Sequence, residues 1–276
     1  RYFLADVSRV DKKVLKEGWR EKEVKVLAGC APCQPFSTYN QARDTRADGQ
    51  WSLLKAFGRL VRECEPDLVT MENVSALARH AVFQDFCTGL RGRGFEVVWA
   101  VLDCRDFGVP QARKRLVLIG SRLGKPSLPN PVVAANSEWR TVRESIADLP
   151  RIEAGKSHPK DTIHVASRLS ARNLERIRAS RPGGSWRDWP KHLIAPCHKK
   201  RSGRSYPAVY GRMEWDAPAP TMTGQCYGFG NGRFGHPEQD RGISLREAAI
   251  LQTFPRDYSF VEDGAAVSMT SATSTP

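Results

Sequence analysis

The sequence predicts an α/β protein with an open, mostly parallel sheet, joined to a smaller irregular region. Strand-like and helix-like segments alternate over roughly the first 120 residues, which is the pattern of such sheets. From about Leu123 the composition changes to Pro, Gly, Trp and basic residues, and a helical pattern returns near Leu245. Because open α/β sheets carry their sites at the carboxyl ends of strands, we expect the functional residues directly after strands.

Apolar spacing predicts the individual elements of the first region. Short apolar runs indicate strands, whereas the residues from Trp51 to Cys64 place Leu53, Leu54, Phe57 and Leu60 at helical spacing. The predicted strands are Val24–Ala28, Asp67–Met71, Glu96–Leu102 and Arg115–Gly120, and the predicted helices are Trp51–Cys64 and Phe83–Leu90.

The later part of the chain offers fewer regular elements. Between Leu123 and Pro220 only Thr141–Ile146 and Ser170–Ser180 have helical spacing. The segment Leu245–Phe254 predicts an amphipathic helix that Pro255 stops. The last dozen residues, rich in Ser, Thr and Ala, predict a frayed tail, and no internal repeat is evident.

The overall charge favours a polyanionic partner. The formal net charge is +13 and the pI is near 9.7, so nucleic acid is the first expectation and a membrane surface the second. No window has the apolar length of a spanning helix and the first residues lack a signal-peptide pattern, which argues against a membrane and for the cytoplasm. The basic run Lys191–Arg204 fits a solvated face or a nucleic-acid contact about equally. Seven cysteines, an odd number, indicate reduced thiols.

The loop GCAPCQPFS, Gly29–Ser37, raises three interpretations of its two cysteines. Cys30 and Cys33 have the spacing of half a zinc site, but no second pair follows. A redox pair needs a helix start, whereas Pro32 and Pro35 hold the chain extended around Cys33. A reactive thiol on a rigid loop remains, against the common alternative of a small buried cysteine.

Four segments of the sequence resemble one known family. Pro32-Cys33-Gln34 with Pro35-Phe36-Ser37 resembles the nucleophile motif of the DNA (cytosine-5) methyltransferases. Further along, in the family's order, come Glu72-Asn73-Val74, then Gln111-Ala112-Arg113-Lys114-Arg115, and finally Arg246-Glu247-Ala248-Ala249-Ile250-Leu251-Gln252-Thr253-Phe254-Pro255. With their connections, these segments cover most of residues 6 to 260.

The resemblance implies a Rossmann-like, S-adenosylmethionine-dependent methyltransferase sheet whose N-terminal strands are missing, with a smaller irregular target-recognition region. The implied segments are a partial catalytic domain over 1–122, a target-recognition region over 123–235, a return segment over 236–260 and a tail over 261–276. The family's acidic, Phe- and Gly-rich donor loop and its closing Asn-Ala-Val-Pro segment are not found in this sequence.

The same resemblance implies the catalytic residues. Cys33 is the nucleophile that adds to cytosine C6, because C5 alone is too weak to take a methyl group from a sulfonium. Glu72 relieves charge at N3 of the ring by protonation or hydrogen bonding. Arg115 contacts the cytosine O2 and the neighbouring sugar-phosphate, while Arg113 supports the thiol and the carboxylate. As i and i+2 residues leading into a strand, the two arginines are expected to point the same way.

The partners follow from the resemblance as well. Duplex DNA is the substrate, and the target cytosine is rotated out of the stack; RNA is a weaker expectation. Gln34, Ser37 and Thr221 correspond to residues that touch DNA, and Asp6 and Pro32 to residues on the side of the S-adenosylmethionine donor. A full-length member of this type is expected to be a monomer. The type of enzyme expected is that of bacterial or phage restriction-modification systems.

Two interpretations of the sequence remain open. In one the chain is a cytosine-5 methyltransferase, and in the other it is a non-catalytic DNA-binding remnant that lacks a complete donor site. The segment Gly230–Gly235 satisfies the dinucleotide pattern GxGxxG literally. No strand is predicted before it and His236-Pro237 follows where a helix would begin, so it is interpreted as a recognition-region loop.

Overall fold

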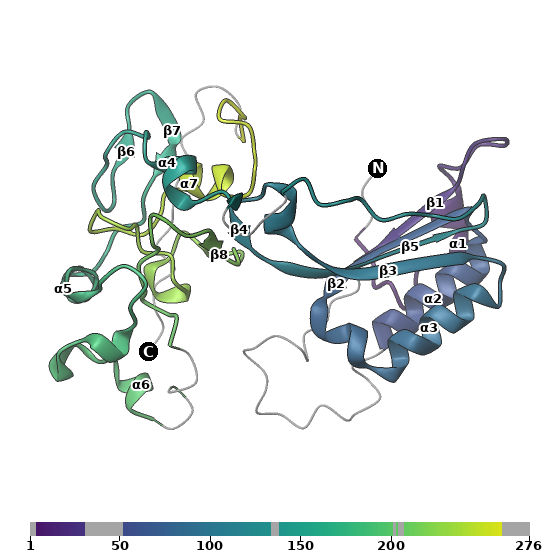
Figure 1. Cartoon of the computed structure of the whole chain (residues 1–276), viewed down its shortest axis with the longest axis horizontal. Coiled ribbons are helices and arrows are strands. Elements are labelled where there is room, and N and C mark those ends of the chain that lie inside the picture. Colours follow the sequence, from purple (N-terminus) through teal and green to yellow (C-terminus); the bar gives the residue numbers. More distant parts are fainter. Residues whose placement is uncertain (1–3, 31–51, 134–137, 201–202, 204–206, 261–276) are drawn as a thin grey trace. The chain divides into compact units, whose positions relative to one another are not determined.

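The computed structural model describes residues 4–30, 52–133, 138–200, 203 and 207–260. They form two compact units (Figure 1), the first from Arg1–Asp103 and Lys114–Asn130, the second from Cys104–Arg113 and Pro131–Pro276. The chain thus leaves the first unit after Asp103, returns at Lys114 and leaves it again after Asn130. The division into a catalytic domain over 1–122, a recognition region over 123–235, a return segment over 236–260 and a tail over 261–276 stays a prediction. Among the described residues, no helix combines the length and the apolar character needed to cross a membrane.

The first unit contains a four-stranded sheet in the order β1-β2-β5-β3. Strand β1 pairs parallel with β2, whereas β5 pairs antiparallel with both β2 and β3. Three strands therefore run in one direction, and the fourth is inserted between two of them in the opposite direction. The expectation that most neighbouring strands pair in parallel is wrong, since two of the three described pairings in this sheet are antiparallel. The strands are β1 (Val26–Gly29), β2 (Leu68–Val74), β3 (Glu96–Asp103) and β5 (Lys114–Ser121).

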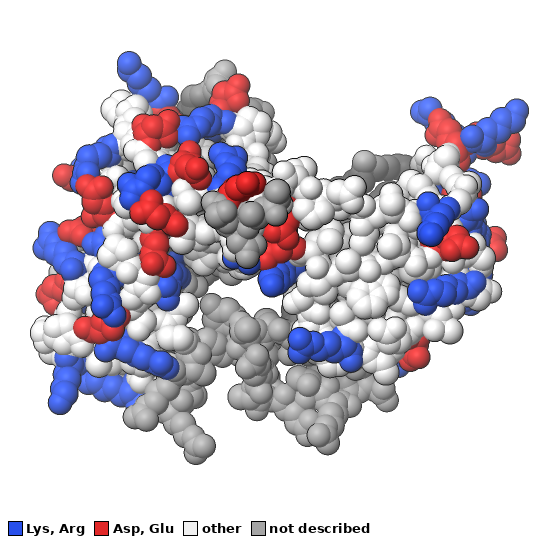
Figure 2. All heavy atoms as spheres, in the orientation of Figure 1, with Lys and Arg blue, Asp and Glu red and all other residues white. Residues whose placement is uncertain are grey.

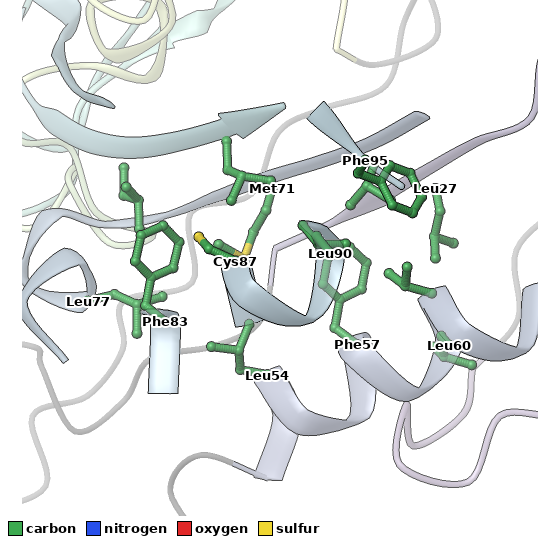
Figure 3. Close-up of a cluster of buried hydrophobic side chains, with 14 residues drawn as sticks. Leu27, Leu54, Phe57, Leu60, Met71, Leu77, Phe83, Cys87, Leu90 and Phe95 are labelled. Atoms are coloured by element: carbon green, nitrogen blue, oxygen red, sulfur yellow. The ribbon is translucent and has the colours of Figure 1, made fainter. Parts of the chain in front are cut away.

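Helices α2 (Ser52–Cys64) and α3 (Ala81–Arg91) pack on one face of this sheet (Figure 1). The predicted helical spacing directs Leu54, Phe57 and Leu60 into a core that also receives Met71 from β2 (Figure 3). Phe83 of α3 meets Trp99 of β3 edge to face, with ring centroids 5.1 Å apart. Two short helices complete the unit, α1 (Lys12–Lys16) and the 3-10 helix η3 (Ser75–Arg79).

Strict alternation along β2 decides which side chains face away from these helices. Val69, Met71 and Asn73 are buried, while the residues between them are partly exposed. Successive strand side chains point to opposite faces, so Glu72 lies on the face opposite the core. The alternation that buries Met71 beneath the helices therefore also places the Glu72 side chain on the other face of the sheet.

The second unit consists of short elements joined by irregular chain, as the composition predicts. Two clusters of buried side chains hold it together, one around Met213, Ile243 and Leu251 and one around Trp186, Trp189 and Phe229. Its elements are η4 (Cys104–Phe107), β4 (Gln111–Ala112), α4 (Val142–Ile146), β6 (Ser157–His158), β7 (Asp161–Val165), α5 (Ala171–Ala179), η6 (Trp186–Asp188), η7 (Lys191–Leu193), α6 (Pro196–Lys199), β8 (Ala219–Pro220), η9 (Phe229–Asn231) and α7 (Leu245–Ile250).

Backbone bonds bring the start and the end of a long excursion of this unit together. The N–H of Val142 donates to the carbonyl of Ala217 and that of Arg143 to the carbonyl of Trp215, each at 2.9 Å. The Arg143 guanidinium also binds both carboxylate oxygens of Asp216, at 2.6 and 3.0 Å. Residues 144–214 therefore form a loop that is closed at its base.

Helix α7 differs from its prediction in length and in character. It ends at Ile250 because Thr253 adopts a left-handed conformation with φ 67°, which lets the Phe254 N–H bond back to the Ala249 carbonyl at 3.1 Å. Pro255 is therefore not what stops it. Residues 246–250 are all buried, so the expectation of an amphipathic helix is also wrong.

The glycine-rich segment Gly230–Gly235 is no dinucleotide loop. The 3-10 helix η9 overlaps its start, no strand precedes it within the described residues 207–229 apart from β8, and the residues from His236 to Ile243, all described, form no helix. Without a strand before it and a helix N-terminus after it, the segment cannot cradle a pyrophosphate. The rejection of the dinucleotide pattern is confirmed, and the assignment to a recognition region stays a prediction.

Three buried ionisable side chains meet at the start of α7. The Arg241 guanidinium donates to both carboxylate oxygens of Glu247 at 2.7 Å, and the two side chains are 0% and 1% exposed. His236 accepts at Nδ1 from the N–H groups of Glu238 and Gln239 and lies 3.7 Å from the Glu247 carboxylate. Desolvation raises the pKa of Glu247, but the bonds and charge of Arg241 outweigh it and hold that pKa below its usual value.

Replacing His236 by asparagine should flatten the dependence of stability on pH. Burial lowers the pKa of His236 from 6.5 to about 4, so between these values the unfolded chain binds a proton that the folded chain does not. The stabilisation is complete above pH 6.5 and decreases as the pH falls toward 4, by about 3 kcal/mol in all. The Asn Oδ1 keeps an acceptor in place of Nδ1 without titrating. Urea unfolding of both proteins across this interval measures the slope, and equal slopes would contradict the assignment.

Candidate active site

Glu72 and Arg115 are the predicted site residues that the structure brings together. Glu72 lies within β2, which continues to Val74 rather than ending at Met71. Arg115 stands opposite Val74 in the antiparallel ladder, so its side chain is on the same face as that of Glu72, one diagonal step away. The Arg115 Nε donates to Glu72 Oε1 at 2.6 Å, and the side chains are 21% and 40% exposed. An acidic and a basic side chain thus meet on the partly exposed face of the sheet.

Cys30 is a third member of this cluster. It follows β1 directly, and the parallel register places Gly29 beside Met71, the residue before Glu72. The Cys30 thiol donates to Glu72 Oε2 at 2.9 Å. Both oxygens of the Glu72 carboxylate are therefore engaged, one by a guanidinium and one by a thiol. The sequence gives no signal for this contact between residues that are 42 positions apart.

Gly29 determines how closely the strand end approaches the helix beneath it. A Cβ at this position would lie 2.5 Å from the Phe57 ring of α2. Only glycine therefore allows the chain to pass over this ring and to present Cys30 beside Glu72. The loop that begins here carries Pro32, Cys33, Gln34 and Ser37, four of the predicted site residues, which lie outside the described residues.

Arg113 and Thr221 belong to the second unit. Strand β5 starts at Lys114, so Arg113 directly precedes it, and the expectation that Arg113 and Arg115 point the same way stays a prediction. The Arg113 Nη1 donates to the Met222 carbonyl at 3.5 Å. The Thr221 hydroxyl donates to the Ala112 carbonyl at 2.6 Å, so a contact with DNA would use its oxygen as an acceptor or replace this bond.

Gln111 is a residue of this region that the sequence-based reasoning did not single out. It is buried, and its Oε1 accepts from the Met222 N–H at 3.0 Å while β4 pairs with β8. The segment Gln111–Arg113 is thereby fastened to Ala219–Met222. Gln111 lies in one of the motifs that resemble the family, and this was the one sequence signal that could have identified it. Its bond to Met222, 111 positions away, cannot be predicted from local spacing.

Asp6, the described residue expected on the donor side, is exposed and held in a tight turn. Its Oδ1 accepts from the Ser8 N–H at 2.9 Å and from the Ser8 hydroxyl at 2.8 Å, and these bonds lower the pKa of the carboxyl. The Arg59 guanidinium of α2 donates to the carbonyls of Val7 and Val10, both at 3.2 Å. The turn is thus tied to the helix, and an ionised, accessible carboxylate there suits an amino group such as that of adenine.

The comparisons with known proteins identify the family. The profile of the family described as C-5 cytosine-specific DNA methylase matches residues 3–274. The chain belongs to this family. Its members are DNA cytosine-5 methyltransferases, which in general use S-adenosylmethionine, and the resemblance found in the sequence is confirmed.

Three type II enzymes illustrate the relationship. The chain is 49% identical to the methylase M.HgiDII of Herpetosiphon aurantiacus over 96% of its own length and 75% of that protein. It is 32% identical to the methyltransferase M1.HphI of Haemophilus parahaemolyticus over 87% of its length, and 33% identical to M1.BsuMI of Bacillus subtilis over 85%. These two alignments span 62% and 53% of the relatives, so the chain covers little more than half of their length.

A solved structure supports the fold. A prophage-encoded DNA modification methyltransferase of E. coli superimposes with a TM-score of 0.59 at 19% identity, over 91% of this chain and 75% of that one. At this identity the similarity concerns the fold alone. The Rossmann-like methyltransferase fold predicted for the family is thereby confirmed, with the mixed sheet described above.

Proposed function

We propose that this chain methylates C5 of cytosine in duplex DNA as a modification enzyme of the restriction-modification type. The observation that supports this most directly is the Glu72–Arg115 pair, bonded at 2.6 Å on the sheet face beside the strand end from which the Cys33 loop departs. An acid, a guanidinium and a loop carrying a thiol at neighbouring strand ends are what addition to a pyrimidine requires.

In the proposed reaction, the Cys33 thiolate adds to C6 and the electron pair of the C5–C6 double bond moves toward C5. Glu72 donates a proton or a hydrogen bond to N3, which relieves the charge that this addition places on the ring. When bound, S-adenosylmethionine would supply the methyl group to C5 and keep its sulfur as a thioether. A base then removes the proton from C5, N3 returns its proton to Glu72, and the C6–S bond breaks with Cys33 leaving as the thiolate, which restores the ring and the enzyme.

Arg115 is proposed to bind both the catalytic acid, Glu72, and the target cytosine. Its Nε is bound to Glu72, while its guanidinium offers further donors in a fixed plane toward the cytosine O2. A planar fork of this kind can hold two acceptors at once, whereas an ammonium is a point donor. The target cytosine must leave the duplex to reach this cluster, since C6 is covered within the stack.

Replacing Arg115 by lysine should lower kcat by about 10- to 100-fold, because one ammonium cannot keep the geometry of both charge-assisted bonds. Its neighbour Lys114 offers a matched control. Lys114 is largely exposed and lies 3.8 Å from Asp103, so Lys114→Gln should change kcat by less than about threefold. Methyl transfer to a duplex at saturating DNA measures both, and equal losses in the two variants would contradict the role of Arg115.

The basic part of the second unit is proposed to hold the DNA. Residues 186–200 contain Arg187, Lys191, Lys199 and Lys200 but a single acidic residue, Asp188. Figure 2 shows Lys and Arg side chains over the part of this unit where α6 lies. Beneath them the Trp186 and His198 rings stack at 4.3 Å, which gives these cations a rigid support. Such cations bind phosphates, and base edges then supply the sequence preference.

The direct test is methyl transfer from donor labelled in its methyl group to duplex DNA, followed by digestion to nucleosides. Label in 5-methylcytosine is expected. Label confined to another base, or to RNA in a parallel reaction, would contradict the proposal.

The second candidate function, a DNA-binding remnant without catalysis, is distinguished by calorimetry. Saturable heat with S-adenosylmethionine is expected for the methyltransferase, and Asp6→Ala should weaken it. DNA binding without such heat would favour the remnant.

A further inference from the structure

The Glu72 carboxylate has a second, unassigned partner at the centre of the proposed site. Arg115 Nε binds Oε1 at 2.6 Å, and the Cys30 thiol donates to Oε2 at 2.9 Å. The two contacts come from either side of β2, because Cys30 directly follows β1, Arg115 lies in β5, and these strands are the two neighbours of β2 in the sheet. The carboxylate is thus held from both sides.

This arrangement matters because the end of a glutamate side chain is soft. Its last torsion is broad, so a carboxylate bound at one oxygen can still rotate about the bond that carries it. Glu72 is 40% exposed, and packing alone does not fix it. Two donors on separate oxygens define the plane of the carboxylate, and proton donation to a ring nitrogen depends on that plane.

We propose that Cys30 is a positioning residue for Glu72, so that the carboxyl oxygen is already aimed when a cytosine N3 arrives. The inference rests on the proposed function. A thiol suits this task because it is a weak donor, which orients the carboxylate without competing strongly with the base. Cys30 thereby acts through Glu72 and does not itself react.

The test uses a partial reaction that needs no methyl donor. With duplex DNA carrying tritium at cytosine C5, the Cys33 thiolate adds to C6 and C5 takes a proton from water. Loss of tritium from C5 to water and departure of the thiolate then restore the ring, so tritium release reports addition assisted by Glu72. The full chain is used, and both kcat and KM for the DNA are measured.

Cys30→Ala should lower kcat for release by about tenfold with little change in KM, because it removes one hydrogen bond to a charged group. Cys30→Val, of similar bulk to cysteine but without a donor, should behave like the alanine variant. Cys30→Ser keeps a donor and should stay within about threefold of the parent. In a Glu72→Gln background, Cys30→Ala should lower kcat for release by less than about a further twofold, because the carboxylate through which Cys30 acts is no longer present.

Three outcomes would overturn the inference while leaving the proposed function intact. These are release unaffected by Cys30→Ala, equal losses in the serine, valine and alanine variants, and an undiminished effect of Cys30→Ala in the Glu72→Gln background. Unfolding curves of each variant show whether a loss comes from misfolding, and the valine variant, which also lacks the donor, serves if the alanine variant does not fold. No release by the parent chain would instead overturn the proposed function itself.

Discussion

Cys33→Ser is expected to reduce methyl transfer by about a thousandfold or more, while the dissociation constant for duplex DNA changes by less than about threefold. A hydroxyl is a far weaker nucleophile than a thiolate at neutral pH, so the addition to C6 is lost. Affinity should persist because it comes chiefly from phosphate contacts, which the basic second unit is proposed to supply. Transfer is measured with labelled donor and affinity by titration at fixed salt.

A duplex that carries 5-fluorocytosine separates this prediction from indirect effects. Fluorine at C5 cannot leave as a proton does, so the adduct should persist and mass spectrometry should locate it on Cys33. Cys197→Ser is the matched control, since Cys197 is an exposed thiol of the second unit and its removal should leave the adduct unchanged. An adduct on any other side chain, or one that survives Cys33→Ser, would place the nucleophile elsewhere.

Glu247→Ala is expected to reduce the free energy of unfolding by about 3–5 kcal/mol, because it leaves the Arg241 charge buried without a counter-ion. Arg241 is fully buried, and both of its Nη groups donate to this carboxylate. Glu247 also accepts from the Ser244 N–H at 2.7 Å, which completes the capping box of α7. The variant loses the ion pair and the cap together, and urea unfolding followed by tryptophan fluorescence measures the change.

The chain provides its own control for this experiment. Glu144 occupies the same place in the capping box of α4, with the Thr141 N–H at 2.7 Å, but in an exposed setting. Glu144→Ala should therefore cost only about 1 kcal/mol. Glu247→Gln, which keeps a cap but removes the charge, should fall between the two. Similar losses of unfolding free energy in Glu144→Ala and Glu247→Ala would show that the buried ion pair contributes nothing to stability beyond the cap.

The sequence predicts the elements of the first unit closely, but not their pairing. Helical spacing places the helix over Trp51–Cys64, and the structure has Ser52–Cys64, because Leu54, Phe57 and Leu60 must all face one core. The insertion of β5 between β2 and β3 leaves no local trace, since apolar runs indicate strands without indicating neighbours. The early end of α7 depends on a left-handed threonine, a conformation that composition does not predict.

The candidate site divides in the same way. Motif resemblance identified Glu72 and Arg115, and the ladder between β2 and β5 brings them into contact. The roles of Cys33 and of the other residues of its loop stay predictions. Cys30 and Gln111 were not identified, because each acts through a bond to a residue distant in the chain. Such contacts arise from strand register, which a single sequence does not reveal.

Residues 144–214 lie within the region predicted to recognise the target DNA, and the closed base of this excursion bears on how that predicted role could change. Since the backbone bonds of Val142 and Arg143 to Ala217 and Trp215 join its two ends, a substitute segment of another length would begin and finish at adjacent points. Doubling the length of such a loop costs only about 0.6 kcal/mol of closure entropy. Chimaeras joined at these positions should fold only if the graft also retains the side chains that bond the rest of the unit, among them His164, 2.8 Å from Ser244, and Asp161, 2.7 Å from Arg246. If the predicted recognition role holds, exchange of residues 144–214 between relatives would change the preferred DNA sequence without rebuilding the rest of the unit.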